Sequence, residues 1–99
     1  MNQRKEILYS KSAYKYLSKL HKPKARQIVT AINKLPDEEQ SKSLDIKKIK
    51  GIENLYRLRV DDYRVLFTPE HEVIKIDKID SRGGIYRGIK WEHSKKTVR

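Results

Sequence analysis

The first half of the chain has the pattern of a short strand followed by two amphipathic helices. An apolar run within residues 6–9 predicts a strand, and Ser10 is a suitable N-cap for a helix that starts near Lys11. Apolar residues then recur every three or four positions in two stretches, which are separated near Pro23 and end at Pro36. The apolar positions are Ala13, Tyr16, Leu17 and Leu20 in the first stretch and Ala25, Ile28, Val29, Ile32 and Leu35 in the second. Because few residues separate the stretches, they predict an antiparallel helical hairpin.

Beyond Gly51 the apolar residues alternate with polar ones, as in strands that bury one face. Two alternating runs, residues 56–60 and 63–67, flank Asp61-Asp62 and predict a hairpin with a two-residue turn. A third strand is expected after a turn that contains Pro69. The remaining expectations are a loop at residues 37–43, an irregular strand or turn at 44–49, the third strand at 73–79, and a short tail or helix at 83–99.

This order of elements predicts an α+β fold. We expect the N-terminal strand and the two-helix hairpin to pack on one face of a small antiparallel sheet. The chain has 99 residues, the size of one ordinary domain, so we expect residues 1–99 to form a single domain.

Composition excludes several classes of chemistry. The chain has no cysteine, which excludes a disulfide framework and a thiolate nucleophile. Its three histidines lack the spacing of metal ligands, and its glycines match no nucleotide-binding motif, so we expect no metal and no cofactor. The sequence contains neither a signal peptide nor an apolar stretch of membrane-spanning length, and the expected location is the cytoplasm.

The net charge of the chain narrows the class of binding partner that we expect. Lys and Arg number 24 against 13 Asp and Glu, which gives a formal net charge of +11. This excess favours a polyanionic partner such as nucleic acid or the ribosome. Lysines on solvated helix faces also keep small proteins soluble, so charge alone does not define an activity.

The predicted hairpin concentrates arginines on one face. A turn at Asp61-Asp62 places Arg59 opposite Arg64 and Arg57 opposite Leu66, on the side away from the helices. Like charges placed directly opposite each other destabilise a sheet unless an anion lies between them, and a phosphate would be such an anion. The alternative is that exposed strands carry arginine for solubility and to prevent edge pairing.

Further candidates follow the last predicted strand. Arg82 precedes a glycine pair and could hold a phosphate through two hydrogen bonds, and Tyr86 could stack on a base or transfer a proton. A tyrosine in this position could instead serve packing alone. Weaker contacts to RNA or the ribosome are expected from Lys47, Lys48, Lys50 and Arg87, for which a solvated surface is the alternative.

The run Leu55–Phe67 (LYRLRVDDYRVLF), followed by a strand and then SRGGIYR at residues 81–87, resembles the core motif of the RelE/ParE superfamily of bacterial type II toxins. The resemblance implies a toxin that a cognate antitoxin neutralises. RelE-like members enter the ribosomal A site and cut mRNA without a metal, by attack of a 2′-hydroxyl on the adjacent phosphate. ParE-like members inhibit DNA gyrase instead. A third possibility is an inactive relative that contacts operator DNA only within a repressor complex with its antitoxin.

The resemblance favours the endonuclease, with ribosome, mRNA and antitoxin as partners and no membrane. It implies that Arg57, Arg59, Arg64, Arg82 and Tyr86 are the catalytic residues. Many relatives have a glycine-histidine pair where Asp80-Ser81 precedes Arg82 here, so no histidine is available at that position as an acid or base. Arginine hardly loses its proton, which assigns the arginines to charge stabilisation and leaves Tyr86 as the best candidate for proton transfer.

Overall fold

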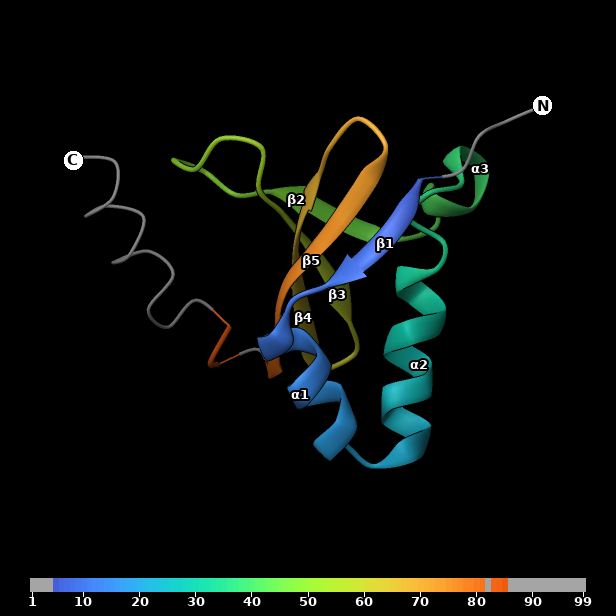
Figure 1. The fold of residues 1–99 in the computed structure, drawn as a ribbon, viewed down its shortest axis with the longest axis vertical. Coiled ribbons are helices and arrows are strands. Elements are labelled where there is room, and N and C mark those ends of the chain that lie inside the picture. The colour runs from blue at the N-terminus through green and yellow to red at the C-terminus, as the bar shows by residue number, and fades with distance from the viewer. Residues whose placement is uncertain (1–4, 82, 86–99) are drawn as a thin grey trace.

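The computed structural model describes residues 5–81 and 83–85, which form five strands and three helices (Figure 1). In chain order the elements are β1 (Glu6–Tyr9), α1 (Lys11–Lys19), α2 (Lys22–Ile32), α3 (Glu38–Ser41), β2 (Asp45–Lys48), β3 (Tyr56–Val60), β4 (Tyr63–Pro69) and β5 (Val73–Ser81).

All five strands belong to one sheet with the order β1-β5-β4-β3-β2. Strands β2 to β5 pair antiparallel, whereas β1 pairs parallel with β5. The predicted α+β class is therefore confirmed, with a mixed sheet. The N-terminal strand forms an edge of this sheet instead of packing on its face with the helices.

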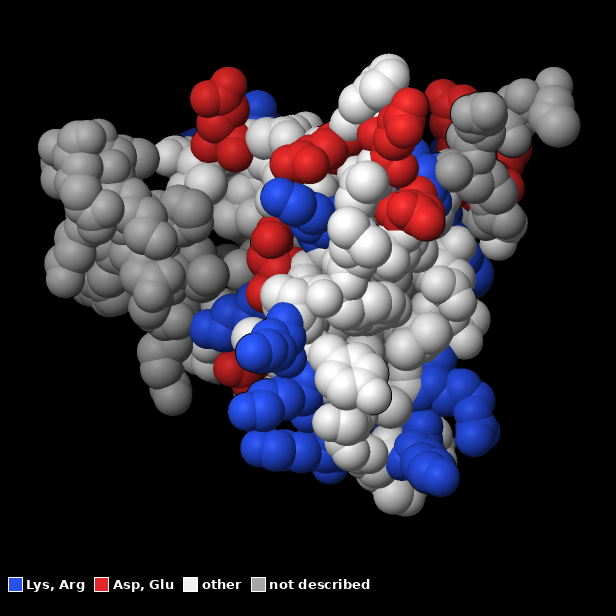
Figure 2. Space-filling view, viewed as in Figure 1, with Lys and Arg blue, Asp and Glu red and all other residues white. Residues whose placement is uncertain are grey.

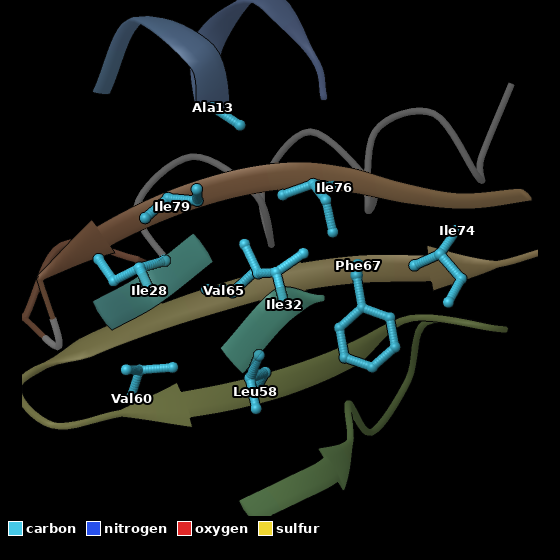
Figure 3. Close-up of a cluster of buried hydrophobic side chains, with 10 residues drawn as sticks. All are labelled: Ala13, Ile28, Ile32, Leu58, Val60, Val65, Phe67, Ile74, Ile76 and Ile79. Atoms are coloured by element: carbon cyan, nitrogen blue, oxygen red, sulfur yellow. The ribbon is translucent and has the colours of Figure 1, made fainter. Parts of the chain in front are cut away.

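Helices α1 and α2 cover one face of the sheet and close the main core (Figures 1 and 3). Ala13 of α1 and Ile28 and Ile32 of α2 are fully buried against strand residues. The strands contribute Leu58, Val60, Val65, Phe67, Ile74, Ile76 and Ile79. The fully buried residues of both helices are thus among the apolar positions that the helical periodicity predicts.

Ser10 fixes the start of α1 and joins it to β5. Its hydroxyl oxygen accepts a hydrogen bond from the Ala13 amide at 3.0 Å, as expected of an N-cap. The same hydroxyl donates to the Asp77 carbonyl at 2.9 Å.

A bulge at Asp77 changes which residues of β5 face the helices. Leu66 pairs with Lys78, but Phe67 pairs with Ile76, so Asp77 is the extra residue. The Thr68 hydroxyl donates to the Asp77 carboxylate at 2.7 Å. The bulge turns Ile79 toward the helices together with Ile76, and Lys78 toward the opposite face.

Several element boundaries differ from the sequence-based expectations. The expected loop at 37–43 contains α3, whose first turn is capped by Asp37 through the amides of Glu39 and Gln40. Pro69 ends β4 instead of lying in the turn, and β5 extends two residues beyond the predicted strand. Residues 44–49 contain the regular strand β2. The expected C-terminal tail or helix lies outside the described residues except for residues 83–85.

Charge is unevenly spread over the surface. On the face in Figure 2, Lys and Arg gather mainly where α1 and α2 meet, and most Asp and Glu lie toward the opposite end. Among the residues that the structure describes, no helix is long and apolar enough to cross a membrane.

Candidate functional site

The β3–β4 hairpin has the register that its sequence predicts. Val60 pairs with Tyr63 and Arg59 with Arg64, so Asp61 and Asp62 form the turn. Asp61 adopts the left-handed conformation with φ of 58°, and its carboxylate pairs with Lys24 of α2 at 2.7 Å. This turn places the arginines on the face of the sheet away from α1 and α2, which we call the arginine face.

Two rows of side chains cross the arginine face from β2 to β5. The first row is Asp45, Arg59, Arg64 and Asp80. The second row is Lys47, Arg57, Leu66 and Lys78. The first row therefore has two central cations flanked by two carboxylates.

The two opposed arginines, Arg59 and Arg64, bind different partners. Nη1 of Arg59 lies 3.8 Å from a carboxylate oxygen of Asp45. Nη1 of Arg64 donates to the backbone carbonyls of Asp61 and Tyr63, both at 3.1 Å. The repulsion expected between two like charges is thus reduced by anionic and carbonyl oxygens of the protein itself.

Arg57 is more enclosed than Arg59, whose side chain is 52% exposed. Only 14% of the Arg57 side-chain surface is exposed, and its Nη2 donates to Oδ1 of Asp45 at 2.9 Å. Its Nε is buried and has no hydrogen-bond partner within residues 5–81 and 83–85. The Arg57 guanidinium therefore retains an unused donor, which is uncommon for a buried polar group.

A second, smaller core covers part of the arginine face. Leu66 is fully buried there against Leu55 and Ile85, with Ile49 and Ile52 packed beside them. Lys78 donates to the Gly84 carbonyl at 3.4 Å. The turn after β5 is thus attached to the arginine face.

Tyr16 of α1 lies near the end of β5, with its ring edge-on to Tyr63 at a centroid distance of 6.3 Å. Burial raises the pKa of Tyr16, and the nearby Asp80 carboxylate and Tyr63 raise this pKa further, while a hydrogen bond with the Ser81 backbone lowers it. A raised pKa keeps the Tyr16 phenol neutral at neutral pH, so it is poorly suited to act as a base.

A groove of about 600 Å³ lies beside the arginine face, between α2 and the β2–β3 edge. Its lining includes Arg26 of α2, Lys34 just beyond the end of α2, and both Asp45 and Arg59 of the sheet. The first row of the arginine face thus continues into a partly basic groove.

The predicted site residues fall into three groups. Arg57, Arg59 and Arg64 share the arginine face, and Lys47 joins them beside Arg57. Lys48 pairs with Tyr56 and lies on the opposite face, and Lys50 lies in the turn after β2. Arg82, Tyr86 and Arg87 lie outside the described residues.

Sequence reasoning missed three charged residues of this face, Asp45, Lys78 and Asp80. Asp45 and Lys47 alternate with Ile46, so reading residues 44–49 as a regular strand would have found Asp45. Lys78 and Asp80 carry no such signal, because their orientation depends on the bulge at Asp77. Within the described ranges, no three His, Cys, Asp or Glu side chains are grouped so as to hold a metal ion.

Comparison with known proteins places the chain in a family. The family model described as the ParE toxin of the parDE type II toxin-antitoxin system matches residues 7–86. No curated protein sequence matches the chain significantly.

Solved toxin-antitoxin complexes contain chains with the same fold. A chain of the archaeal RelE–RelB complex from Pyrococcus horikoshii is 30% identical, with a TM-score of 0.69 over 83% of this chain and 99% of that one. A chain of the RelB–RelE complex from Methanococcus jannaschii is 30% identical, with a TM-score of 0.67 over 80% and 94%. The RelBE2 complex from Mycobacterium tuberculosis shares the fold at 17% identity, with a TM-score of 0.63 over 81% and 100%.

Proposed function

The chain belongs to the RelE/ParE superfamily of type II toxins, and we propose that it is a ribosome-dependent endonuclease that cuts mRNA in the ribosomal A site. The observation that carries this proposal is the arginine face, where Arg57, Arg59 and Arg64 share one side of a rigid hairpin. A cluster of guanidinium groups is suited to bind a phosphodiester and its transition state.

In the proposed reaction the 2′-oxygen of one nucleotide attacks the adjacent phosphorus. The 2′-hydroxyl gives up its proton, a new bond forms between this oxygen and phosphorus, and the bond from phosphorus to the 5′-oxygen breaks. The 5′-oxygen takes up a proton as it leaves. The products are a 2′,3′-cyclic phosphate and a 5′-hydroxyl end, and water is not consumed.

The arginines stabilise the charge that develops on the non-bridging phosphate oxygens. Preorganised cations directed at developing charge are usually the largest single contribution to such catalysis. Arg57 is suited to this role because its guanidinium is mostly enclosed and its Nε has no hydrogen-bond partner among the described residues. Arg82, which follows β5 in the chain, adds a fourth cation in this proposal.

Proton transfer is assigned to Tyr86 in this proposal. Arginine cannot serve as a base, and the Tyr16 phenol is held neutral by its raised pKa. Nearby arginines would lower the pKa of a tyrosine from its usual value of about 10. A site without a strong base is expected to depend on the ribosome to orient the mRNA, since correct orientation supplies much of the rate.

The test uses purified full-length protein and ribosomes programmed with a defined mRNA, with the new 5′ ends mapped by primer extension. We expect cuts within the A-site codon that are strongly reduced in Arg57→Ala and in Arg82→Ala. Lys15→Ala is the matched control, because it removes an exposed cation of α1, which covers the opposite face of the sheet. Absence of A-site cuts, or cuts undiminished in Arg82→Ala, contradicts the proposal.

Inhibition of DNA gyrase is the second candidate function, because the matching family model is that of the ParE toxin. In that case the arginines would be surface charge or would contact gyrase or DNA. Purified gyrase with supercoiled plasmid distinguishes the two functions. Gyrase–DNA cleavage complexes trapped by the protein, together with intact mRNA on ribosomes, select gyrase inhibition.

The proposed binding partner is a RelB-type antitoxin. The two archaeal relatives at 30% identity come from structures of RelE–RelB complexes. We expect an antitoxin gene adjacent to this one whose product copurifies with the chain and relieves growth arrest. Copurification without growth arrest by the free chain supports instead an inactive member that acts only in a repressor complex.

A further inference from the structure

The carboxylate of Asp45 lies against two arginines of the arginine face, Arg57 and Arg59. Its Oδ1 accepts the hydrogen bond from Arg57 at 2.9 Å, and its Oδ2 faces Arg59 at 3.8 Å. The pairing of β2 with β3 fixes this position, because Asp45 lies directly opposite Arg59. Each oxygen thus faces one guanidinium, which is the arrangement that two non-bridging oxygens of a phosphate would adopt.

Asp45 is the more exposed partner in the ion pair with Arg57, so another anion can replace its carboxylate. The Arg57 side chain is 14% exposed and enclosed by protein, whereas Asp45 is 47% exposed. An ion pair with a half-exposed carboxylate contributes little to stability, so exchanging it for another anion costs little. Arg57, in contrast, is mostly enclosed and stays charged, so it favours an anion beside it, whether that anion is Asp45 or a phosphate.

The bond between Arg57 and Asp45 also leaves the guanidinium incompletely satisfied. Asp45 is bonded through one terminal nitrogen, and the buried Nε has no partner among the described residues. A buried donor without a partner disfavours the present arrangement. A small movement of the Arg57 side chain toward a new anion would therefore forfeit only one good hydrogen bond.

We infer that Asp45 is an internal competitor for the substrate phosphate, which occupies Arg57 and Arg59 in the free protein and is displaced when RNA binds. This inference rests on the proposed function for the identity of the anion as an RNA phosphate. Asp45 is a positioning residue in this view. It prevents Arg57 from taking up arbitrary anions and lowers the affinity for RNA that is not held in place by the ribosome.

The test compares Asp45→Asn with Asp61→Asn. Both variants remove one negative charge, and both aspartates are 47% exposed and ion-paired, but Asp61 pairs with Lys24 away from the arginine face. Asparagine also tolerates the left-handed backbone of residue 61. Affinity for a short fluorescein-labelled single-stranded RNA is measured by fluorescence anisotropy at fixed salt.

We expect Asp45→Asn to bind the RNA about three- to fivefold more tightly than Asp61→Asn, the effect of releasing one half-exposed ion pair. Equal affinities of the two variants, weaker binding by Asp45→Asn, or no RNA binding by either variant overturns the inference. If wild-type protein fails to cut mRNA on programmed ribosomes, the proposed function fails, but this comparison still decides the role of Asp45.

A second measurement uses the wild-type protein, so it does not depend on the folding of a variant. The Nε–H resonance of Arg57 is assigned through Arg57→Lys and followed by NMR while the same RNA is added. Displacement of Asp45 shifts this resonance, whereas the backbone amide of the exposed Lys15 of α1 serves as the reference. An Arg57 resonance that stays at its free position in the RNA-saturated protein overturns the inference.

Discussion

Arg59 and Arg64 lie directly opposite each other across β3 and β4, yet each guanidinium interacts with a different part of the protein. Arg59 faces Asp45, and Arg64 bonds the carbonyls of the hairpin turn. Two like charges are thus kept on neighbouring strands at a cost to the sheet. Such a cost is typical of functional sites, where residues are retained for activity and not for stability.

Replacement of Arg59 is therefore expected to lower the activity of the protein without lowering its stability. Arg59→Thr removes the charge opposite Arg64, introduces a residue that favours strands, and leaves the bond between Asp45 and Arg57 intact. We expect the free energy of unfolding in urea to stay the same or rise by about 0.2–1 kcal/mol. Cutting on programmed ribosomes is expected to fall about 100-fold or more. Loss of stability together with full activity would show that Arg59 serves the fold alone.

The two glycines after β5 are expected to respond differently to the same substitution. A Cβ on Gly84 would lie 2.9 Å from Oδ2 of Asp80, whereas no described atom lies within 4 Å of one on Gly83. Gly84→Ala should therefore displace Asp80 or the turn, with a loss of about 1–3 kcal/mol. Gly83→Ala is the control and should change the unfolding free energy by less than about 0.5 kcal/mol. If urea unfolding shows equal changes in unfolding free energy for Gly84→Ala and Gly83→Ala, the Asp80 side chain moves aside freely.

The hairpin was predictable because the residues that fix its register are close together in the sequence. Asp61-Asp62 lies between two runs that alternate between apolar and polar residues except at Leu66, so one turn fixes the register and places Arg57, Arg59 and Arg64 on one face. The partners of these arginines depend on pairings between distant segments. Asp45 reaches Arg59 only through the β2–β3 pairing across a long loop, and a four-residue edge strand carries little pattern of its own.

The orientation of β5 was not predictable for a related reason. Strict alternation through residues 73–79 puts Ile76 and Ile79 on opposite faces, whereas the structure buries both on the helix side. The bulge that brings them together is held by Thr68 of β4 and by Ser10 before α1. Neither contact is visible in the local sequence. The roles of Arg82 and Tyr86 remain predictions from the sequence and the family resemblance.

Ser10 is expected to be the most sensitive serine near α1. Ser10→Ala removes both the N-cap bond to the Ala13 amide and the bond to the Asp77 carbonyl. We expect a loss of about 1–2 kcal/mol in the free energy of unfolding, the upper part of the range that is typical when an N-cap residue is replaced by alanine. Ser12→Ala, at an exposed position of the same helix, should stay within about 0.5 kcal/mol of wild type. Thermal and urea unfolding measure both variants, and a neutral Ser10→Ala would exclude a stabilising role of the cap.

Alkaline pH is expected to destabilise the protein partly through Tyr9. Burial raises the pKa of Tyr9 above its ordinary value of 10.0, so the folded state keeps a phenol proton that the unfolded state loses. The contribution of Tyr9 to the free energy of unfolding is fully present below the pKa that Tyr9 has in the unfolded state. This contribution is lost as the pH rises through the pKa that Tyr9 has in the folded state. Lys24, whose pKa is raised by its hydrogen bond to Asp61, contributes in the same direction.

Tyr9→Phe isolates the contribution of Tyr9 to this alkaline loss. Urea unfolding between about pH 9 and pH 11 should show a shallower decline than in wild type, by at most the roughly 1.4 kcal/mol per pH unit that one proton gives. Tyr14→Phe is the control, because it removes a phenolic hydroxyl from a tyrosine that is 66% exposed. Because phenylalanine cannot ionise, identical slopes for Tyr9→Phe and wild type would assign the alkaline loss to other groups with raised pKa values, such as Lys24 and Tyr16.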